Sequence, residues 1–441
     1  MNLVVAKFLG DVLGEVKCKA VHGTLRQELL DHIECLKEDY IEEGMDEKSA
    51  YEKAIAQMGE AMEVGKALNK AHKPRMEWSV LALIIGILSI GILTFMYWNR
   101  QTIPGEVPFD YLYKQSVYIG IGFILFIGVC FFDYRYLKKG SICIYVLGII
   151  ALLYTLVFGI QINGLKRWVL IGPFAMNIYT MVMPLLLIGY TGIVKKWGGE
   201  KIKDYFILGL FAIIPILLMA LEDLPTSLLT GLTLVMVLTF HIMGREFKGE
   251  KKKFLTILYS IVGGSGLLGA LLYFKSPYRL NRIVMSYYPE LDPLGAGYQV
   301  LKLKEVREHA ALIGDAGFKY IAGYIPEPLT DTMFTTIVGC LGWIAGMGLI
   351  LMVALIIIRM YKASCRVQES YGRLLSFSIT TLFTIQFVYN IGMNLGLLPL
   401  SSISLPFISY GGTGMLMNLF LMGIFLSVYR KKDIVLLDAT I

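Results

Sequence analysis

Long apolar segments dominate the sequence from Trp78 onward and are separated by short polar loops. A helix needs about 20 apolar residues to cross the hydrocarbon core of a bilayer. The composition agrees, since 56% of the residues are hydrophobic and only 17% are charged, whereas soluble domains carry about 25% charged residues. The sequence therefore predicts an all-α polytopic membrane protein with about ten transmembrane helices. The expected spans lie near residues 79–98, 115–132, 142–161, 177–194, 206–221, 226–243, 254–273, 332–358, 374–395 and 414–429.

Basic residues gather in every second loop. The positive-inside rule places such loops in the cytoplasm, so we expect both termini to be cytoplasmic. The net charge of +7 is spread over all of these loops and forms no single patch, which argues against nucleic acid as a partner. The basic loop residues are Arg135, Lys138, Lys139, Lys195, Lys196, Lys201, Lys203, Arg245, Lys248, Lys251, Lys252, Lys253, Arg359, Lys362, Arg366, Arg373, Arg430, Lys431 and Lys432.

Residues 1–75 differ from the rest, because charged residues mix there with apolar residues at helical spacing. Thr24-Leu25-Arg26-Gln27 predicts a capping box that opens a helix ending at Gly44. Asp46 is expected to cap a second helix that ends at Gly59, and a third short helix is expected over Glu60–Ala71. We interpret this part as a cytoplasmic helical prefix domain, with a role in docking more than in catalysis.

The membrane domain, residues 76–441, contains one loop that is much longer than the others. It covers residues 274–331 and lies between the seventh and eighth expected spans, on the expected outer face. Loops longer than about 12–15 residues are usually functional or disordered. This loop combines Tyr, Ile and Leu with charged residues. That mixture suits a substrate with a lipid tail and a polar head.

Four motifs follow one another along the membrane domain. They are NGLKRW at 163–168, YRLNR at 278–282 followed by DPLGAGYQ at 292–299, IPEPLTD at 325–331, and LLP at 397–399 followed by LPFISYGGT at 405–413. Together they resemble the signature of the SEDS family, the shape, elongation, division and sporulation proteins of bacterial cell-wall synthesis. The resemblance extends over about residues 80–432.

The resemblance implies a peptidoglycan glycosyltransferase in the bacterial cytoplasmic membrane. Such a protein polymerises lipid II, an undecaprenyl-pyrophosphate-linked disaccharide peptide, at the outer face. It usually works with a transpeptidase of the class B penicillin-binding proteins. The role could be in cell division, cell shape or sporulation.

The same resemblance implies roles for individual residues. Asp292 matches the essential outer-loop aspartate of the family and is the expected catalytic base; the competing interpretation is a structural cap of the following turn. The expected substrate-binding residues are Lys166, Arg167, Trp168, Arg279, Arg282, Gln299, Glu327 and Asp331. The four basic ones are candidates to hold pyrophosphate. Interfacial anchoring and helix capping are the structural alternatives for this set.

Several family positions are changed in this sequence. The family's acidic QPSE entry becomes Asn177–Met183, PDLGTA becomes Glu222–Ser227, and the EE pair of the eighth span is replaced within Gly339–Gly342. Ionisable groups inside a membrane are costly and usually functional. Their loss therefore indicates an altered polar network, and it leaves open a non-catalytic scaffold or regulator of cell-wall synthesis. A lipid-linked precursor transporter is a weaker alternative, because its charged site should lie near the midplane.

No cofactor is evident from the sequence. The six cysteines show no CxxC pair and no metal-like spacing, so neither a disulfide framework nor a zinc site is expected. A divalent cation that assists a pyrophosphate leaving group is compatible with the implied chemistry, although no ligand cluster stands out.

Overall fold

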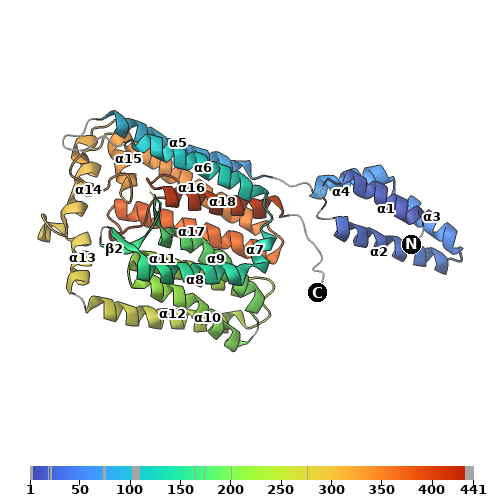
Figure 1. The fold of residues 1–441 in the computed structure, drawn as a ribbon. Coiled ribbons are helices and arrows are strands. Elements are labelled where there is room, and N and C mark those ends of the chain that lie inside the picture. Colours follow the sequence, from blue (N-terminus) through green and yellow to red (C-terminus); the bar gives the residue numbers. More distant parts are fainter. Residues whose placement is uncertain are drawn as a thin grey trace. The chain divides into compact units, whose positions relative to one another are not determined.

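The computed structural model describes residues 3–17, 19, 22–72, 76–101, 110–162, 164–172, 174–199, 201–275 and 277–432. The chain divides into two compact units. The smaller unit comprises Met1–Met76, Arg366–Ser370 and Val428–Ile441, and the larger, membrane unit comprises Glu77–Cys365 and Tyr371–Ser427. Figure 1 colours both units along the sequence, from blue for the amino-terminal helices to red for the last described residues.

The smaller unit contains four amino-terminal helices: α1 (Leu3–Glu15), α2 (His22–Glu42), α3 (Glu47–Met58) and α4 (Ala61–His72). Asp46 caps α3 as expected, because its side chain accepts a hydrogen bond from the backbone N–H of Ser49, and Gly59 ends the helix. The expected capping box at Thr24 is wrong. The helix already begins at His22, so Thr24 lies inside its first turn.

Helix α1 was not expected from the sequence. It buries Val5, Phe8, Leu9 and Val12, which recur at the spacing of one helix face. These residues pack with Leu29, Ile33 and Ala54 into the core of the small unit. With α1 added to the three expected helices, the unit gains apolar area that a three-helix arrangement of this length would lack.

Nine helices in the described part of the chain are long and apolar enough to cross a membrane, which confirms the polytopic all-α class. They are α5 (Trp78–Arg100), α6 (Tyr111–Phe131), α8 (Ser141–Phe158), α9 (Ile178–Trp197), α10 (Ile202–Ala220), α11 (Leu224–Met243), α16 (Trp343–Cys365), α17 (Ser370–Asn394) and α18 (Gly412–Arg430). The expected seventh span coincides with α12 (Lys251–Phe274). A short helix, α7 (Arg135–Lys139), joins α6 to α8.

The eighth expected span is broken into two helices, which corrects the prediction of one helix over 332–358. Helix α15 (Met333–Leu341) ends at Gly342, and α16 begins at the next residue. Gly342 has a φ of 90°, a conformation that a residue with a Cβ rarely adopts. The preceding loop fills the break, because the backbone N–H of Trp343 donates to the Ala311 carbonyl over 3.0 Å.

A three-stranded antiparallel sheet lies between α8 and α9 and was also not expected. Its strands are β1 (Ile160–Ile162), β2 (Leu165–Ile171) and β3 (Phe174–Asn177), in that order. Trp168 on β2 stands opposite Ile160 on one side and Asn177 on the other. The sheet carries three of the candidate residues, Lys166, Arg167 and Trp168, on its central strand.

The long loop has secondary structure of its own. It contains α13 (Pro277–Tyr287), the 3₁₀ turn η2 (Pro289–Leu291), α14 (Tyr298–His309) and the 3₁₀ turn η3 (Phe318–Tyr320). Figure 1 shows α13, α14 and β2 at the same end of the membrane unit. Arg307 on α14 donates a 2.6 Å hydrogen bond to the carbonyl of Asn394, the last residue of α17. The loop is therefore attached to the helix bundle.

Candidate functional site

Asp292 follows η2 and begins the tight turn that leads into α14. Its carboxylate accepts hydrogen bonds from the backbone N–H groups of Gly295 at 3.0 Å and Ala296 at 2.9 Å. The carbonyl of Asp292 also accepts from the N–H of Gly297 at 3.0 Å. The side chain is half-buried. The structural interpretation, a carboxylate that caps its own turn, is thus realised, and the turn also fixes the carboxylate in one orientation.

The two glycines of this turn lie against the aspartate. A Cβ at Gly295 would collide with the Asp292 carboxylate, and a Cβ at Gly297 would collide with the carbonyl of Pro289. Neither glycine has a positive φ. Close approach of the backbone, and not an unusual backbone conformation, is therefore the reason for glycine at both positions.

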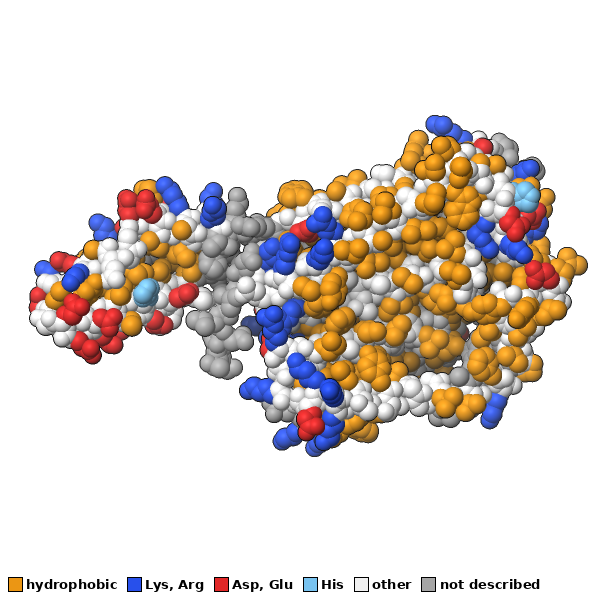
Figure 2. All heavy atoms as spheres, turned by 180° about the vertical axis from the view of Figure 1, so that it is seen from behind, with side chains coloured by type: hydrophobic (Ala, Val, Ile, Leu, Met, Phe, Trp, Pro, Cys, Tyr) orange, Lys and Arg blue, Asp and Glu red, His pale blue; other side chains and the backbone are white. Residues whose placement is uncertain are grey.

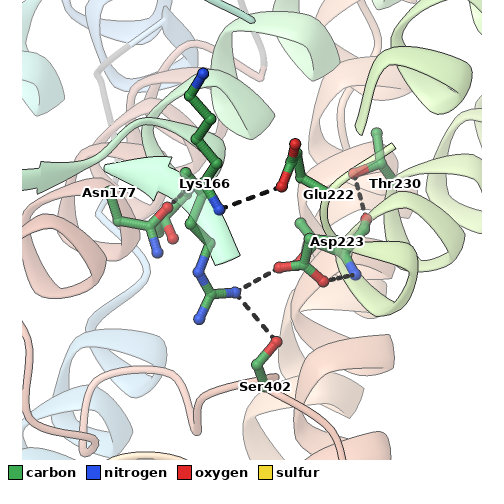
Figure 3. Close-up of polar contacts among 9 residues, drawn as sticks. Lys166, Asn177, Glu222, Asp223, Thr230 and Ser402 are labelled. Carbon is green, nitrogen blue, oxygen red and sulfur yellow. Dashed lines mark hydrogen bonds and ion pairs between the residues drawn. The ribbon is translucent and has the colours of Figure 1, made fainter. Parts of the chain in front are cut away.

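Arg167 and Asp223 form the central ion pair of a second cluster, shown in Figure 3. The Arg167 Nη1 group donates to Asp223 Oδ2 and, over 3.1 Å, to Ser402 Oγ. Asp223 also caps α11, because it accepts hydrogen bonds from the Thr226 N–H at 3.2 Å and the Thr226 hydroxyl at 2.9 Å. The Asp223 side chain is only 1% exposed. The cluster joins β2, the start of α11 and the segment before α18.

Lys166 is engaged by the protein in a different way. Its ammonium group donates to the carbonyls of Leu156 at 2.8 Å and Val157 at 3.1 Å, at the carboxyl end of α8. A cation there complements the helix dipole. The Lys166 backbone N–H donates to Glu222 at 3.3 Å, while its side chain extends away from Glu222 and Asp223 in Figure 3. Lys166 is thus a helix-capping residue in this structure.

Asp331 and Glu327 lie within electrostatic range of the Arg167 pair. Burial raises the pKa of Asp331 to about 7, an effect opposed by Arg167 and reinforced by Glu327 and Asp223. Glu327 has a φ of 48°, which is rare for a residue other than glycine. Its carbonyl accepts hydrogen bonds from the N–H and the hydroxyl of Thr330. The structure therefore places Asp331 close enough to Arg167, Glu327 and Asp223 for their charges to act on it.

Two buried asparagines on α17 hold this segment and were not identified from the sequence. The Asn390 side chain donates to the carbonyls of Asp331 at 2.9 Å and Ile403 at 2.7 Å. The Asn394 side chain donates to the Asp331 carbonyl at 3.0 Å and accepts from the Thr335 hydroxyl at 2.9 Å. Their spacing of four residues puts both on one helix face. Two amides at that spacing in an apolar span were the available signal.

The remaining candidate substrate-binding residues are Trp168, Gln299, Arg282 and Arg279. Trp168 and Gln299 are half-buried, on β2 and in the first turn of α14. Arg282 is exposed on α13 and has no ion pair to another described residue. The side chain of Arg279 lies outside the described part of the structure.

The Asp292 turn and the Arg167 cluster occupy the same end of the membrane unit, as the positions of α14 and β2 in Figure 1 show. Within the described residues, no hydrogen bond or ion pair joins the two groups. That part of the chain also contains no group of three or more His, Cys, Asp or Glu side chains placed to hold a metal ion. The compatibility of the site with a divalent cation, inferred from the implied chemistry, stays a prediction.

A bundle of membrane-crossing helices, with a carboxylate turn and a charged cluster at one end, defines a polytopic membrane protein with a polar site near the bilayer surface. The family model described as Cell cycle protein (FtsW/RodA/SpoVE) matches residues 75–434. The chain belongs to this family, which is the SEDS family indicated by the motifs.

Comparisons with individual proteins agree with this assignment. The chain is 27% identical to Stage V sporulation protein E of Bacillus subtilis (strain 168), with 80% of this chain and 96% of the relative aligned. It is 26% identical to the probable peptidoglycan glycosyltransferase FtsW of Idiomarina loihiensis, over 82% and 89% of the two chains. A solved chain from "Structural coordination of polymerization and crosslinking by a peptidoglycan synthase complex" has a TM-score of 0.65 at 23% identity, covering 81% of this chain and 98% of that one. This last likeness concerns the fold.

Proposed function

We propose that this protein is a peptidoglycan glycosyltransferase that polymerises lipid II at the outer face of the cytoplasmic membrane. Membership of the family and relatives named as peptidoglycan glycosyltransferases support the activity. The main structural support for the proposed mechanism is the carboxylate of Asp292 in the long loop, which two backbone hydrogen bonds hold in one orientation.

Asp292 has the chemistry that the reaction requires of a base. The 4-hydroxyl of one sugar attacks the anomeric carbon of another, a C–O bond forms, the lipid pyrophosphate leaves, and the hydroxyl proton passes to the base. A carboxylate has about four acceptor sites. The two backbone hydrogen bonds to Gly295 and Ala296 use one site on each oxygen. Each oxygen therefore retains an acceptor site for the sugar hydroxyl.

The pyrophosphate requires a cation, and the candidates differ in their availability. Arg167 is neutralised by Asp223 and Lys166 is bound to carbonyls of α8. Arg282 is exposed and lies on α13, which is followed by η2 and the Asp292 turn. We therefore assign the contact with the leaving pyrophosphate to Arg282 and a supporting role to the Arg167 pair.

A class B penicillin-binding transpeptidase is the proposed partner. Polymerised glycan must be crosslinked to form a wall, and one structural relative comes from a complex that couples polymerisation to crosslinking. The proposed orientation, with both termini in the cytoplasm, places the long loop on the side where lipid II is consumed.

The decisive experiment extends labelled lipid II with purified protein and its cognate transpeptidase. Asp292→Ala should reduce the rate by about 10²–10⁴-fold, the usual contribution of a general base. Asp292→Asn is the matched variant, because its amide oxygen still accepts a turn hydrogen bond but is not basic. Wild-type activity in a folded Asp292→Asn protein would refute the assignment of the base.

A non-catalytic scaffold is the second candidate. Two of the four basic residues expected to contact substrate, Lys166 and Arg167, are instead occupied by protein groups. A scaffold that acts through residues 1–75 would lose function on deletion of those residues and keep it with Asp292→Ala. Complementation of a deletion strain with both variants separates the two functions.

A further inference from the structure

A groove of about 550 Å³ lies where α10 and α12 begin. It is lined by Lys201, Ile202, Lys248, Gly249, Glu250, Lys253 and Phe254. The other end of α12, at Phe274, leads into the loop that carries Asp292. A helix of this length spans about 36 Å, so the groove is well separated from the proposed catalytic end.

Three lysines and one glutamate give the groove an excess of positive charge. In the described part of the chain, the ammonium groups of Lys201, Lys248 and Lys253 make no hydrogen bond or ion pair, and all three side chains are exposed. Two nearby lysines differ. Lys251 donates to the Gly244 carbonyl at 3.0 Å, and Lys195 pairs with Glu246 at 2.7 Å. The three ammonium groups that line the groove are thus not engaged by described protein groups.

The groove also has an apolar side. Phe254, which lines it, packs against Tyr205 and Phe247, with ring centroids 4.8 and 5.2 Å apart. An exposed apolar stripe begins at Ile202 and continues along one face of α10. Its residues, at spacings of three or four, are Ile202, Phe206, Leu210, Ile213 and Leu217. Phe206 is 76% exposed.

Positive charge at a polar boundary, continued by an apolar helix face, matches an amphiphile with an anionic head. Figure 2 shows Lys and Arg side chains gathered at this end of the membrane unit and apolar side chains over its middle. The first turns of α10 and α12 add the positive ends of two helix dipoles. A free phosphate would use the lysines but not the stripe on α10.

We propose that this groove binds the headgroup phosphate of an anionic phospholipid, with the acyl chains lying along the exposed face of α10. Basic pockets between transmembrane helices on the cytoplasmic side are a recognised type of lipid site. The groove volume also lies within the roughly 300–1,000 Å³ of ligand pockets. Glu250 is the acidic group among the lining residues and opposes binding.

The test measures binding of phosphatidylglycerol to the full-length protein by native mass spectrometry, with phosphatidylcholine as the neutral reference. The triple variant K201Q/K248Q/K253Q should bind phosphatidylglycerol about tenfold more weakly or worse, since each lysine contributes to attraction of anionic lipid. The control variant K138Q/K139Q/K203Q removes the same charge from basic residues that do not line the groove, and should bind as wild type does. Glu250→Gln should bind more tightly.

Equal losses in the two triple variants would overturn the proposal in favour of a diffuse basic surface. Unchanged binding in K201Q/K248Q/K253Q would overturn it as well. A competition experiment with soluble glycerol phosphate distinguishes a lipid from a free anion. If it displaces phosphatidylglycerol at equal concentration, the occupant is a free anion and the lipid assignment is wrong. A thermal unfolding midpoint for each variant verifies that the lysine substitutions have not unfolded the protein.

Discussion

The guanidinium of Arg167 pairs with the carboxylate of Asp223, although the two residues are 56 positions apart in the sequence. The pair joins the central strand of the small sheet to the start of α11, and Ser402 extends it to the segment before α18. Asp223 is almost fully buried, whereas the Arg167 side chain is 15% exposed. The pair is therefore a structural link on which the end of the bundle depends.

The contributions of the two partners of this pair to stability should be coupled. Asp223→Ala leaves the Arg167 charge buried without its partner, which typically costs about 3–5 kcal/mol. The double variant R167A/D223A should be less destabilised than the sum of the two single variants. Unfolding of the purified protein in detergent measures the difference. Strict additivity of the two losses would contradict the coupling.

The turn glycine Gly295 should be essential for activity but not for folding. Gly295→Ala places a Cβ against the Asp292 carboxylate and so displaces the proposed base. We expect the rate of lipid II extension to fall by about tenfold to a hundredfold, as for a misplacement of about 1 Å. Gly120→Ala is the control, because nothing lies within 4 Å of its Cβ position. An active Gly295→Ala protein would argue that Asp292 only caps the turn.

Stability should depend on pH through Asp331. Its pKa is raised from 3.8 in the reference state to about 7 in the folded protein. A folded carboxyl group with a raised pKa contributes stability below the unfolded pKa, and this contribution is lost as the pH rises through the folded value. Wild-type protein should therefore lose stability between about pH 4 and pH 7.

Asp331→Asn removes this titration and provides the comparison. At pH 8 the variant should melt higher than wild type by on the order of 2 °C. The gap should close near pH 4, where both side chains are neutral. Thermal midpoints at the two pH values test the expectation, and a gap that widens toward low pH would contradict it.

The break between α15 and α16 should require glycine. Gly342 has a φ of 90°, and a Cβ there would lie 2.6 Å from the Leu312 carbonyl oxygen. Gly342→Ala should destabilise the protein by about 1–3 kcal/mol, the usual cost of a strained backbone position. Gly348→Ala on α16 has open space around its Cβ position and serves as the control. Equal unfolding midpoints for the two variants would show that the break tolerates a side chain.

The spans could be predicted because each one is a local property of the chain. Hydropathy over about 20 residues identifies a membrane helix. Nine of the ten expected spans match helices long and apolar enough to cross a membrane, and the remaining one, the seventh, matches α12. The break at Gly342 escaped the same reasoning, because hydropathy continues through it. The unusual length of the expected eighth span and its central glycine were the available signals.

The sheet and the first helix show two other limits. The strands of the sheet are three, seven and four residues long. Such short strands are stabilised by their cross-strand neighbours more than by their own sequence. Helix α1 was different, because Val5, Phe8, Leu9 and Val12 already carried a helical period. That helix could have been predicted from the sequence and was missed.

The sequence by itself determined that this protein lies in a membrane, which family it belongs to and which loop carries Asp292, since hydropathy and each single motif are local properties of the chain. Only the tertiary structure decided which of the charged candidates are already paired. Arg167 meets Asp223 across 56 positions of the sequence, and Lys166 meets the end of α8 because the chain folds back through β1 and β2. Attraction between charges depends on their distance in space and on the surrounding dielectric, and neither quantity can be obtained from the order of residues.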